Sequence, residues 1–234
     1  MKTLKTLSAV AALALASSTS AATVWNVNMG NNVDASDEFL GAAPENTTST
    51  WNSITANGSG QALVDNTGSA AAGVSLDLSG TGFGSGNIAG FDIFDSWTKS
   101  SDNSTEFALA LNGLNDGATY SMVIYSDWFW KNGSSGMPVT QTTGGGLGST
   151  IYVNRELGTT NGSVGALLEA TNPANVDIGP TNYYRIDGLT SDGGVLTFSM
   201  GGVNGPLNGF QLVEVPEPSS LALLGLGGLI AARR

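Results

Sequence analysis

Apolar and polar residues alternate in several stretches along the middle of the chain. In each stretch every second residue is apolar, and the residues between are mostly small or polar. The stretches are Trp25–Met29, Val74–Leu78, Phe107–Leu111, Tyr120–Ile124 and Leu196–Met200. A period of two residues is typical of a β-strand that buries one face. The pattern therefore predicts a strand, with one face in a core, at each of these places.

Turn sequences separate these strands. Residues 113–117 (Gly-Leu-Asn-Asp-Gly) and residues 191–194 (Ser-Asp-Gly-Gly) each join two predicted strands, the second turn following a strand at 183–188. Three further strands are expected, at 61–64, 150–155 and 209–214. About nine strands without a long helical pattern predict an all-β domain, a two-sheet β-sandwich of the jelly-roll type. A parallel β-solenoid is the structural alternative, but no fixed-period repeat supports it.

The absence of two residue types limits the chemistry of this chain. Its 234 residues include 33 glycines but no cysteine and no histidine. Disulfides, zinc or haem sites of ordinary ligation, and Ser-His-Asp or Cys-His catalysis are therefore excluded. Carboxylates, hydroxyls, amides and aromatic rings remain. No catalytic residue is assigned from the sequence.

The first 22 residues have the layout of a cleaved secretory signal peptide. Lys2 and Lys5 precede an apolar run at 7–16, and small residues lead to Ala22. An N-terminal anchor helix is the alternative, but the apolar run is short for that role. The predicted organisation is a signal peptide at 1–22, the sandwich at 23–214 and a separate C-terminal segment at 215–234.

The C-terminal segment has three parts. In chain order they are Pro216-Glu217-Pro218, an apolar run at 221–232, and Arg233 with Arg234. The two prolines favour an extended strip that a protease can reach. As a helix the apolar run would be about 18 Å long, shorter than the roughly 30 Å of a bilayer core, with the arginines holding its end on the cytoplasmic side.

This order of parts resembles the PEP-CTERM sorting signal of Gram-negative bacteria. The resemblance implies a transmembrane sorting helix and processing by an exosortase, a membrane protease that reads the Pro-Glu-Pro motif. It departs from the family in the short helix and the small basic cluster. Two alternatives fit less well. A buried amphipathic helix would not be apolar all round, and a glycolipid anchor signal would have a polar spacer and an apolar end.

The mature region is strongly acidic. Without the two terminal segments, four basic residues (Lys99, Lys131, Arg155 and Arg185) face eighteen acidic ones, a net charge of −14. Such a surface repels nucleic acid and anionic lipid. Nucleic acid is therefore not expected among the partners.

Several segments of the middle region carry a second resemblance. Residues 39–44 (Phe-Leu-Gly-Ala-Ala-Pro), 50–52 (Thr-Trp-Asn) and 73–76 (Gly-Val-Ser-Leu) look like the opening of a group of secreted PEP-CTERM proteins, and 111–114 and 207–212 continue the pattern. The group is similar to galactose-binding-like jelly rolls. The resemblance implies that fold and, for many of its members, carbohydrate held in loops at one edge of the sandwich.

The densest aromatic stretch runs from Tyr125 to Asn132. Indole faces stack on sugar rings while Asp and Asn side chains hydrogen-bond to hydroxyls, so this stretch is a candidate glycan site. The candidate residues are Asp127, Trp128, Trp130 and Asn132. The plainer interpretation is that one face of this strand is core. Weaker candidates are Trp51 with Asn52, where Trp51 is more simply structural, and Tyr183 with Tyr184.

Carboxylates give the only enzymatic alternative. Asp34, Asp37 and Glu38 lie in one loop and Asp92 and Asp95 in another, with Asp127 beside the aromatic stretch. Glycoside hydrolysis needs two carboxyls about 5 to 10 Å apart. The plain interpretation is that these are solvated loop acids. No cofactor is expected, with a structural Ca²⁺ at the Asp34 or Asp92 group as the intermediate alternative.

Three functional hypotheses follow. The first is an exported protein, sorted at the inner membrane and then placed on the cell surface or in the extracellular matrix, whose sandwich binds polysaccharide. The second is a carboxylate-dependent hydrolase or lyase that acts on such polysaccharides. The third is a purely structural matrix protein.

Overall fold

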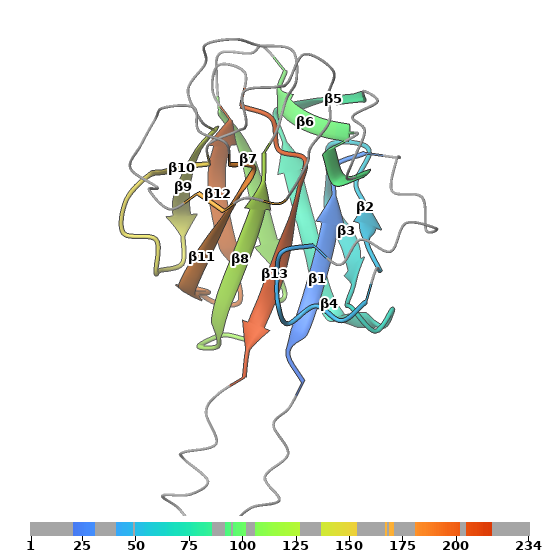
Figure 1. The fold of residues 1–234 in the computed structure, drawn as a ribbon. Helices are drawn as coiled ribbons and strands as arrows, with labels where there is room; N and C mark the ends of the chain where they lie inside the picture. Colours follow the sequence, from blue (N-terminus) through green and yellow to red (C-terminus); the bar gives the residue numbers. More distant parts are fainter. Residues whose placement is uncertain are drawn as a thin grey trace, which may run out of the picture. The chain divides into compact units, whose positions relative to one another are not determined.

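The computed structural model describes residues 21–30, 41–48, 50–85, 92–94, 96–101, 106–126, 137–153, 167, 169–170, 181–201 and 205–216. Within these ranges the chain forms thirteen strands and one short 3-10 helix (Figure 1). The elements are β1 (Thr23–Asn28), β2 (Asn52–Ser53), β3 (Gly58–Val64), β4 (Ala70–Ser79), β5 (Thr81–Ser85), η1 (Asp92–Phe94), β6 (Ser96–Ser100), β7 (Glu106–Asn112), β8 (Thr119–Tyr125), β9 (Met137–Thr143), β10 (Ile151–Val153), β11 (Tyr183–Thr190), β12 (Leu196–Gly201) and β13 (Gly209–Val215).

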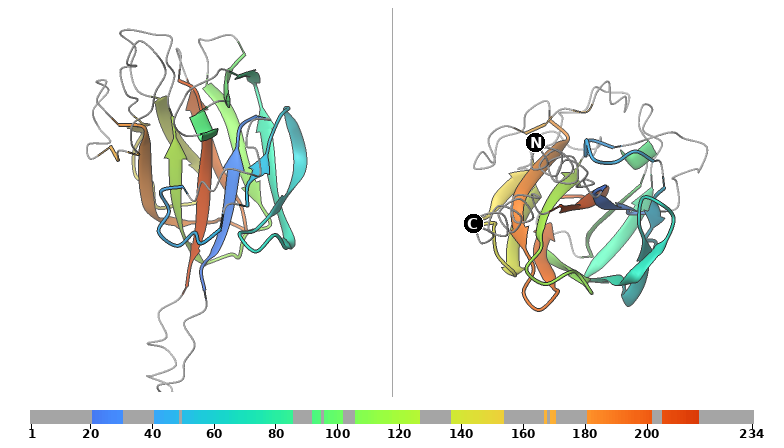
Figure 2. Two further views of the ribbon diagram at one scale, coloured as in Figure 1. Left: turned by 45° about the vertical axis from the view of Figure 1, so that its right-hand side comes forward. Right: turned by 90° about the horizontal axis from the view of Figure 1, so that it is seen from below.

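Two sheets face each other across one core (Figure 2). Sheet A has five strands in the order β11-β8-β13-β1-β2, and sheet B has six in the order β10-β9-β12-β7-β4-β3. Strands β5 and β6 form a separate hairpin. From β7 to β9 and from β11 to β13, each strand lies in the opposite sheet from the one before it. The predicted all-β, two-sheet sandwich of the jelly-roll type is confirmed.

All nine predicted strands are present, and four others were not predicted. Strands β2, β5 and β6 are short or rich in glycine and polar residues, so they lack the alternating signal. Strand β9 lies between β10 and β12 in sheet B, but its alternation stops at Gln141. The Gln141 amide instead closes the following turn, donating to the Gly145 carbonyl at 3.0 Å and accepting from the Leu147 N–H at 2.9 Å.

The inward-facing residues of the alternating stretches form the core as expected. Trp25 and Val27 of β1, Met122 of β8 and Phe210 of β13 all belong to this core together with the apolar residues of sheet B. The expectation of only one buried face is wrong for β1 and β8, because nearly all residues of these strands are buried, on the outer face as well as the inner one. The first five residues of β13, between β1 and β8, are buried in the same way. The outer face of sheet A is therefore covered by other parts of the chain.

The registers of sheet A define two ends of the sandwich. Asn28, Gly209, Tyr125 and Tyr183 lie opposite one another in a row across four strands, at what we call the loop end. At the other end, called the terminal end, Thr23 begins β1 opposite residue 214 of β13. Residues 23–215 form one compact unit, and the second unit, residues 1–22 with 216–234, lies almost wholly outside the described residues.

Candidate functional site

A segment between β1 and β2 crosses the outer face of sheet A. We call its described residues, 41–48 with 50 and 51, the strap; in Figure 1 it is the light-blue loop in front of β13 and β1. The strap covers polar side chains that point away from the core. Asn26 and Gln211 are fully buried beneath it although they lie on the outer face. The strap thus shields this part of the outer face of sheet A from water, and the polar side chains there are buried as in a protein core.

Gln211 of β13 is the centre of the contacts that hold the strap. Its side-chain oxygen accepts hydrogen bonds from the Ala43 N–H at 2.9 Å and from the Tyr125 hydroxyl at 2.5 Å. Its amide nitrogen donates to the Asn26 side-chain oxygen at 2.8 Å. The Ala42 N–H donates to the same Tyr125 hydroxyl. These bonds satisfy buried polar groups that would be costly without partners.

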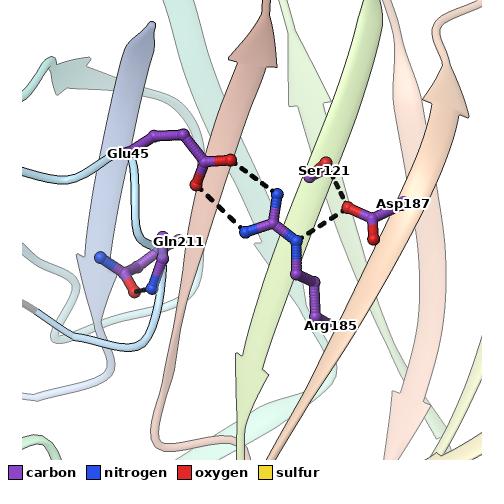
Figure 3. Close-up of polar contacts among 6 residues, drawn as sticks. Glu45, Ser121, Arg185, Asp187 and Gln211 are labelled. Carbon is purple, nitrogen blue, oxygen red and sulfur yellow. Dashed lines mark hydrogen bonds and ion pairs between the residues drawn. The ribbon is translucent and has the colours of Figure 1, made fainter.

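An ion pair fastens the strap at a second point. Both guanidinium Nη atoms of Arg185 on β11 contact the Glu45 carboxylate, at 2.8 and 3.1 Å (Figure 3). The Arg185 Nε donates to Asp187 at 2.8 Å, and the Ser121 hydroxyl donates to the same Asp187 oxygen at 2.6 Å. The bidentate geometry and the half-buried position make this pair stronger than an exposed one.

The ion pair sets the charge states around the strap. Hydrogen bonds from Arg185 lower the pKa of Glu45 below its usual value, and the same contacts raise the pKa of Arg185. Burial raises the pKa of Asp187, but hydrogen bonds from Ser121 and Arg185 outweigh it, so the net shift is downward. At neutral pH all three groups are therefore charged, and two carboxylates neutralise the single guanidinium.

Three aromatic rings lie around Tyr125 at the loop end of sheet A, and we call the four residues the aromatic group. The ring centroid of Tyr125 lies 6.4 Å from that of Trp51 in the strap, 6.2 Å from that of Phe94 in η1 and 6.1 Å from that of Tyr183 on β11. Gly209 lies opposite Tyr125, and a Cβ there would meet the Val27 carbonyl oxygen of β1 and, at 3.0 Å, the Ile93 side chain of η1. Burial raises the pKa of Tyr125 far above its usual value. Tyr125 and Phe94 are buried, whereas Trp51 and Tyr183 are half-buried, with part of each residue open to solvent.

The main predicted glycan-site residues lie outside the described residues. These are Asp127, Trp128, Trp130 and Asn132. The described part of β8 nevertheless fixes where that stretch begins. Strand β8 ends at Tyr125, in the middle of the aromatic group, and Ser126 is held there by a 2.7 Å hydrogen bond to the Pro206 carbonyl. In the sequence, the predicted stretch therefore follows directly on a residue of the aromatic group.

The structure separates the weaker candidates. Trp51 and Tyr183, far apart in sequence, both contact Tyr125. Asn52 is structural: its amide bonds the Asn26 carbonyl at 2.9 Å and the Val64 carbonyl at 2.8 Å, which ties β1 of sheet A to β3 of sheet B. Tyr184 points the other way and packs against the core. Of the four weaker candidates, Trp51 and Tyr183 are the two that the structure shows against Tyr125.

No pattern in the sequence indicates the Glu45–Arg185 pair. The two residues are 140 positions apart, and neither belongs to a recognisable motif. Tyr125 is the first residue of the predicted aromatic stretch, but the glycan-binding role is predicted from the sequence for residues that follow it and not for Tyr125. The strap overlaps the segments 39–44 and 50–52, which carry the resemblance to secreted PEP-CTERM proteins. That resemblance predicts the fold and does not predict that this segment covers sheet A.

The predicted carboxylate groups do not form a described site. Asp92 lies in η1, while Asp34, Asp37, Glu38 and Asp95 fall outside the described residues. Across the described ranges, no three acidic side chains come together as a metal site would require. Among described carboxyls, Glu45, Asp65 and Asp187 have clearly shifted pKa values, all downward, whereas a general acid needs an upward shift.

The predicted sorting motif is described only at its first residue. Pro216 follows β13 directly and is exposed, while Glu217, Pro218, the run at 221–232, Arg233 and Arg234 lie outside the described residues. In the part of the chain that the structure describes, no helix is long and apolar enough to cross a membrane.

Solved structures resemble this chain only distantly. A xylan-binding domain, CBM22-1, from Paenibacillus barcinonensis aligns with 63% of this chain and 85% of its own, at 12% identity and a TM-score of 0.31. The enzymatically active domain of tailspike protein 4 from bacteriophage CBA120 aligns at 13% identity and a TM-score of 0.28, over 61% of this chain but only 19% of the phage protein. At these scores neither neighbour assigns a ligand or an activity to this chain.

A comparison with families identifies the C-terminal segment. A search of curated proteins found no match. The PEP-CTERM protein-sorting motif, however, matches residues 214–234. This confirms the prediction for the tail. Such a motif implies recognition by an exosortase, a membrane protease, and therefore export with sorting at the membrane of a Gram-negative bacterium.

Proposed function

We propose that this is a cell-surface or extracellular-matrix protein, processed through its sorting motif, whose sandwich binds polysaccharide at the loop end. The observation that carries the binding role is the aromatic group around Tyr125. It includes two half-buried residues with part of their surface open to solvent, Trp51 and Tyr183, near the end of β8, which the sequence follows with Asp127–Asn132. A sugar-binding surface needs partly exposed aromatic rings on a rigid support, because the apolar face of a sugar ring stacks on the flat, uncharged face of an aromatic ring.

Rigid support is the second part of the argument. Tyr125 is fully buried and bonded to both the strap and Gln211, so it cannot swing away from the neighbouring rings. Trp51 is fixed from the strap side, because the Asn26 amide bonds the carbonyl of the preceding Thr50 at 2.8 Å. Rings held in advance lose little conformational entropy when a ligand binds.

The charge around the rings supports a neutral or amino-bearing polysaccharide over a polyuronate. Arg185 is the only described cation beside the group, and Glu45 and Asp187 neutralise it. Glu169 pairs with Tyr183 through a β-bridge and adds a further exposed negative charge. A chain of uronic acids would meet repulsion from this surface.

The test is binding of the exported, processed protein to three classes of insoluble polysaccharide: a neutral glucan, a chitosan-type amino-polysaccharide and a polyuronate. Trp51→Ala, Tyr183→Ala and the double variant Trp128→Ala/Trp130→Ala should each weaken binding about tenfold or more, as loss of an aromatic anchor does elsewhere. The matched control is Tyr152→Ala, a half-buried tyrosine on β10 of sheet B. Thermal melts of each variant separate lost binding from lost folding.

The outcomes divide the hypotheses. Binding that needs the loop-end aromatics supports the proposal. No binding to any of the three classes overturns it in favour of a purely structural matrix protein. Soluble sugar products released from a polysaccharide, and abolished by one Asp→Asn or Glu→Gln change, would instead show a carboxylate-dependent hydrolase or lyase.

A further inference from the structure

The sorting motif begins inside the folded sandwich. The match covers residues 214–234, whereas β13 extends to Val215, so the two segments share Glu214 and Val215. No spacer residue separates the last strand from Pro216. The position at which a protease can act therefore depends on how firmly the end of β13 is held.

Both overlapping residues are paired in sheet A. Glu214 lies between two neighbours, opposite Thr23 of β1 on one side and Tyr120 of β8 on the other. Val215 lies opposite Thr119 of β8. The Glu214 side chain is also fixed, because the Asn115 amide donates to its Oε1 at 2.7 Å.

This pairing conflicts with the needs of a protease. A binding partner that takes a peptide in extended form uses its backbone N–H and C=O groups and needs a free strand edge. Glu214 has strands on both sides, so it has no free edge. Pro216 is exposed and is the first residue past the paired region, and as a proline it has no N–H to contribute to a ladder.

We infer that the folded sandwich confines cleavage to bonds C-terminal to Pro216 and that the pairing at the end of β13 limits its rate. This rests on the processing proposed above. Hydrolysis breaks one C–N peptide bond, with the hydroxyl of water going to the carbonyl carbon and its proton to the leaving nitrogen. The sandwich then keeps β13 complete, and the released tail has a new amino terminus.

The first experiment measures the intact mass of the protein exported by producing cells. A C-terminus at Pro216 or at a later residue of the Pro-Glu-Pro strip supports the inference. A C-terminus at Val215 or earlier overturns it, because the protease would then have cut at a bond of a residue that is paired in β13. An intact C-terminus at Arg234 in every fraction overturns the processing proposal itself, and this inference with it.

The second experiment tests the rate. A Gly-Ser-Gly-Ser insertion between Val215 and Pro216 should raise the processing rate in a pulse-chase about tenfold, because the protease no longer competes with the last strand pairs. The matched control places the same four residues after Gly148, whose Cβ position is open space, and leaves the distance to Pro216 unchanged. Normal cleavage with equal rates in the two insertion variants overturns the inference while leaving the processing proposal intact.

Discussion

Gln211→Leu should destabilise the sandwich more than its modest change in size implies. Leucine has similar volume, so the change removes hydrogen bonds without opening a large cavity. Three buried groups lose the Gln211 amide: the Ala43 N–H, the Tyr125 hydroxyl and the Asn26 side-chain oxygen. At about 1–3 kcal/mol for each of these three buried polar groups that loses its partner, the free energy of unfolding should fall by about 3–9 kcal/mol.

Urea unfolding of the mature protein, followed by tryptophan fluorescence, measures this loss. The midpoint should fall with an unchanged m-value, and hydrogen exchange at the Ala43 amide should accelerate because the strap loosens. Gln61→Leu is the matched control, since its amide makes only long contacts of 3.4 and 3.5 Å, and it should cost no more than about 0.5 kcal/mol. A loss under about 1 kcal/mol for Gln211→Leu would refute the view that this amide holds the strap.

Two further substitutions test the strap. Gly41→Ala should lower the free energy of unfolding in urea by about 3 kcal/mol or more, because Gly41 has φ +76° and an added Cβ would lie 2.3 Å from the Gln211 Oε1. The control Gly117→Ala has a similar φ of +78° but open space around the added Cβ, so it should cost only about 1 kcal/mol. Equal losses would contradict this reasoning. Glu45→Gln should flatten the pH dependence of the melting temperature below pH 4.5, the ordinary pKa of a glutamate. Because folding lowers the pKa of Glu45, its carboxylate stabilises the fold fully above pH 4.5, and this stabilisation is lost as the pH falls through the pKa of the folded state. An unchanged acid slope would refute the role of this ion pair.

The alternation of apolar and polar residues predicted the strands because this two-residue period is a local pattern, visible among residues that are neighbours in the sequence. The face buried by Trp25 and Val27 was recognisable from their spacing alone. The burial of Asn26 was not, because it depends on a strap that arrives from later in the chain and on Gln211, which is 185 positions away. A buried asparagine looks like a solvent-facing one until its partners are known.

The candidate site was also predictable only in its local part, because its remaining residues come together through long-range contacts. An aromatic stretch can be found by inspection, but the partners of Tyr125 come from the strap, η1 and β11, and only the fold brings them together. The Glu45–Arg185 pair was missed because no local pattern links the two residues. Long-range contacts thus decide which of several aromatic residues share a surface.

The two proposed activities belong to opposite ends of sheet A. The aromatic group lies at the loop end of β8, whereas the sorting motif begins with Glu214 and Val215, opposite Tyr120 and Thr119 at the terminal end of the same strand. A strand of seven residues separates them, about 20 Å at about 3.3 Å per residue. Sites so far apart are expected to act independently. Trp51→Ala should therefore weaken polysaccharide binding without changing the processing rate, and the insertion before Pro216 should do the reverse. A variant that altered both would mean that β8 couples its two ends, and the proposals of binding and of processing could no longer be treated separately.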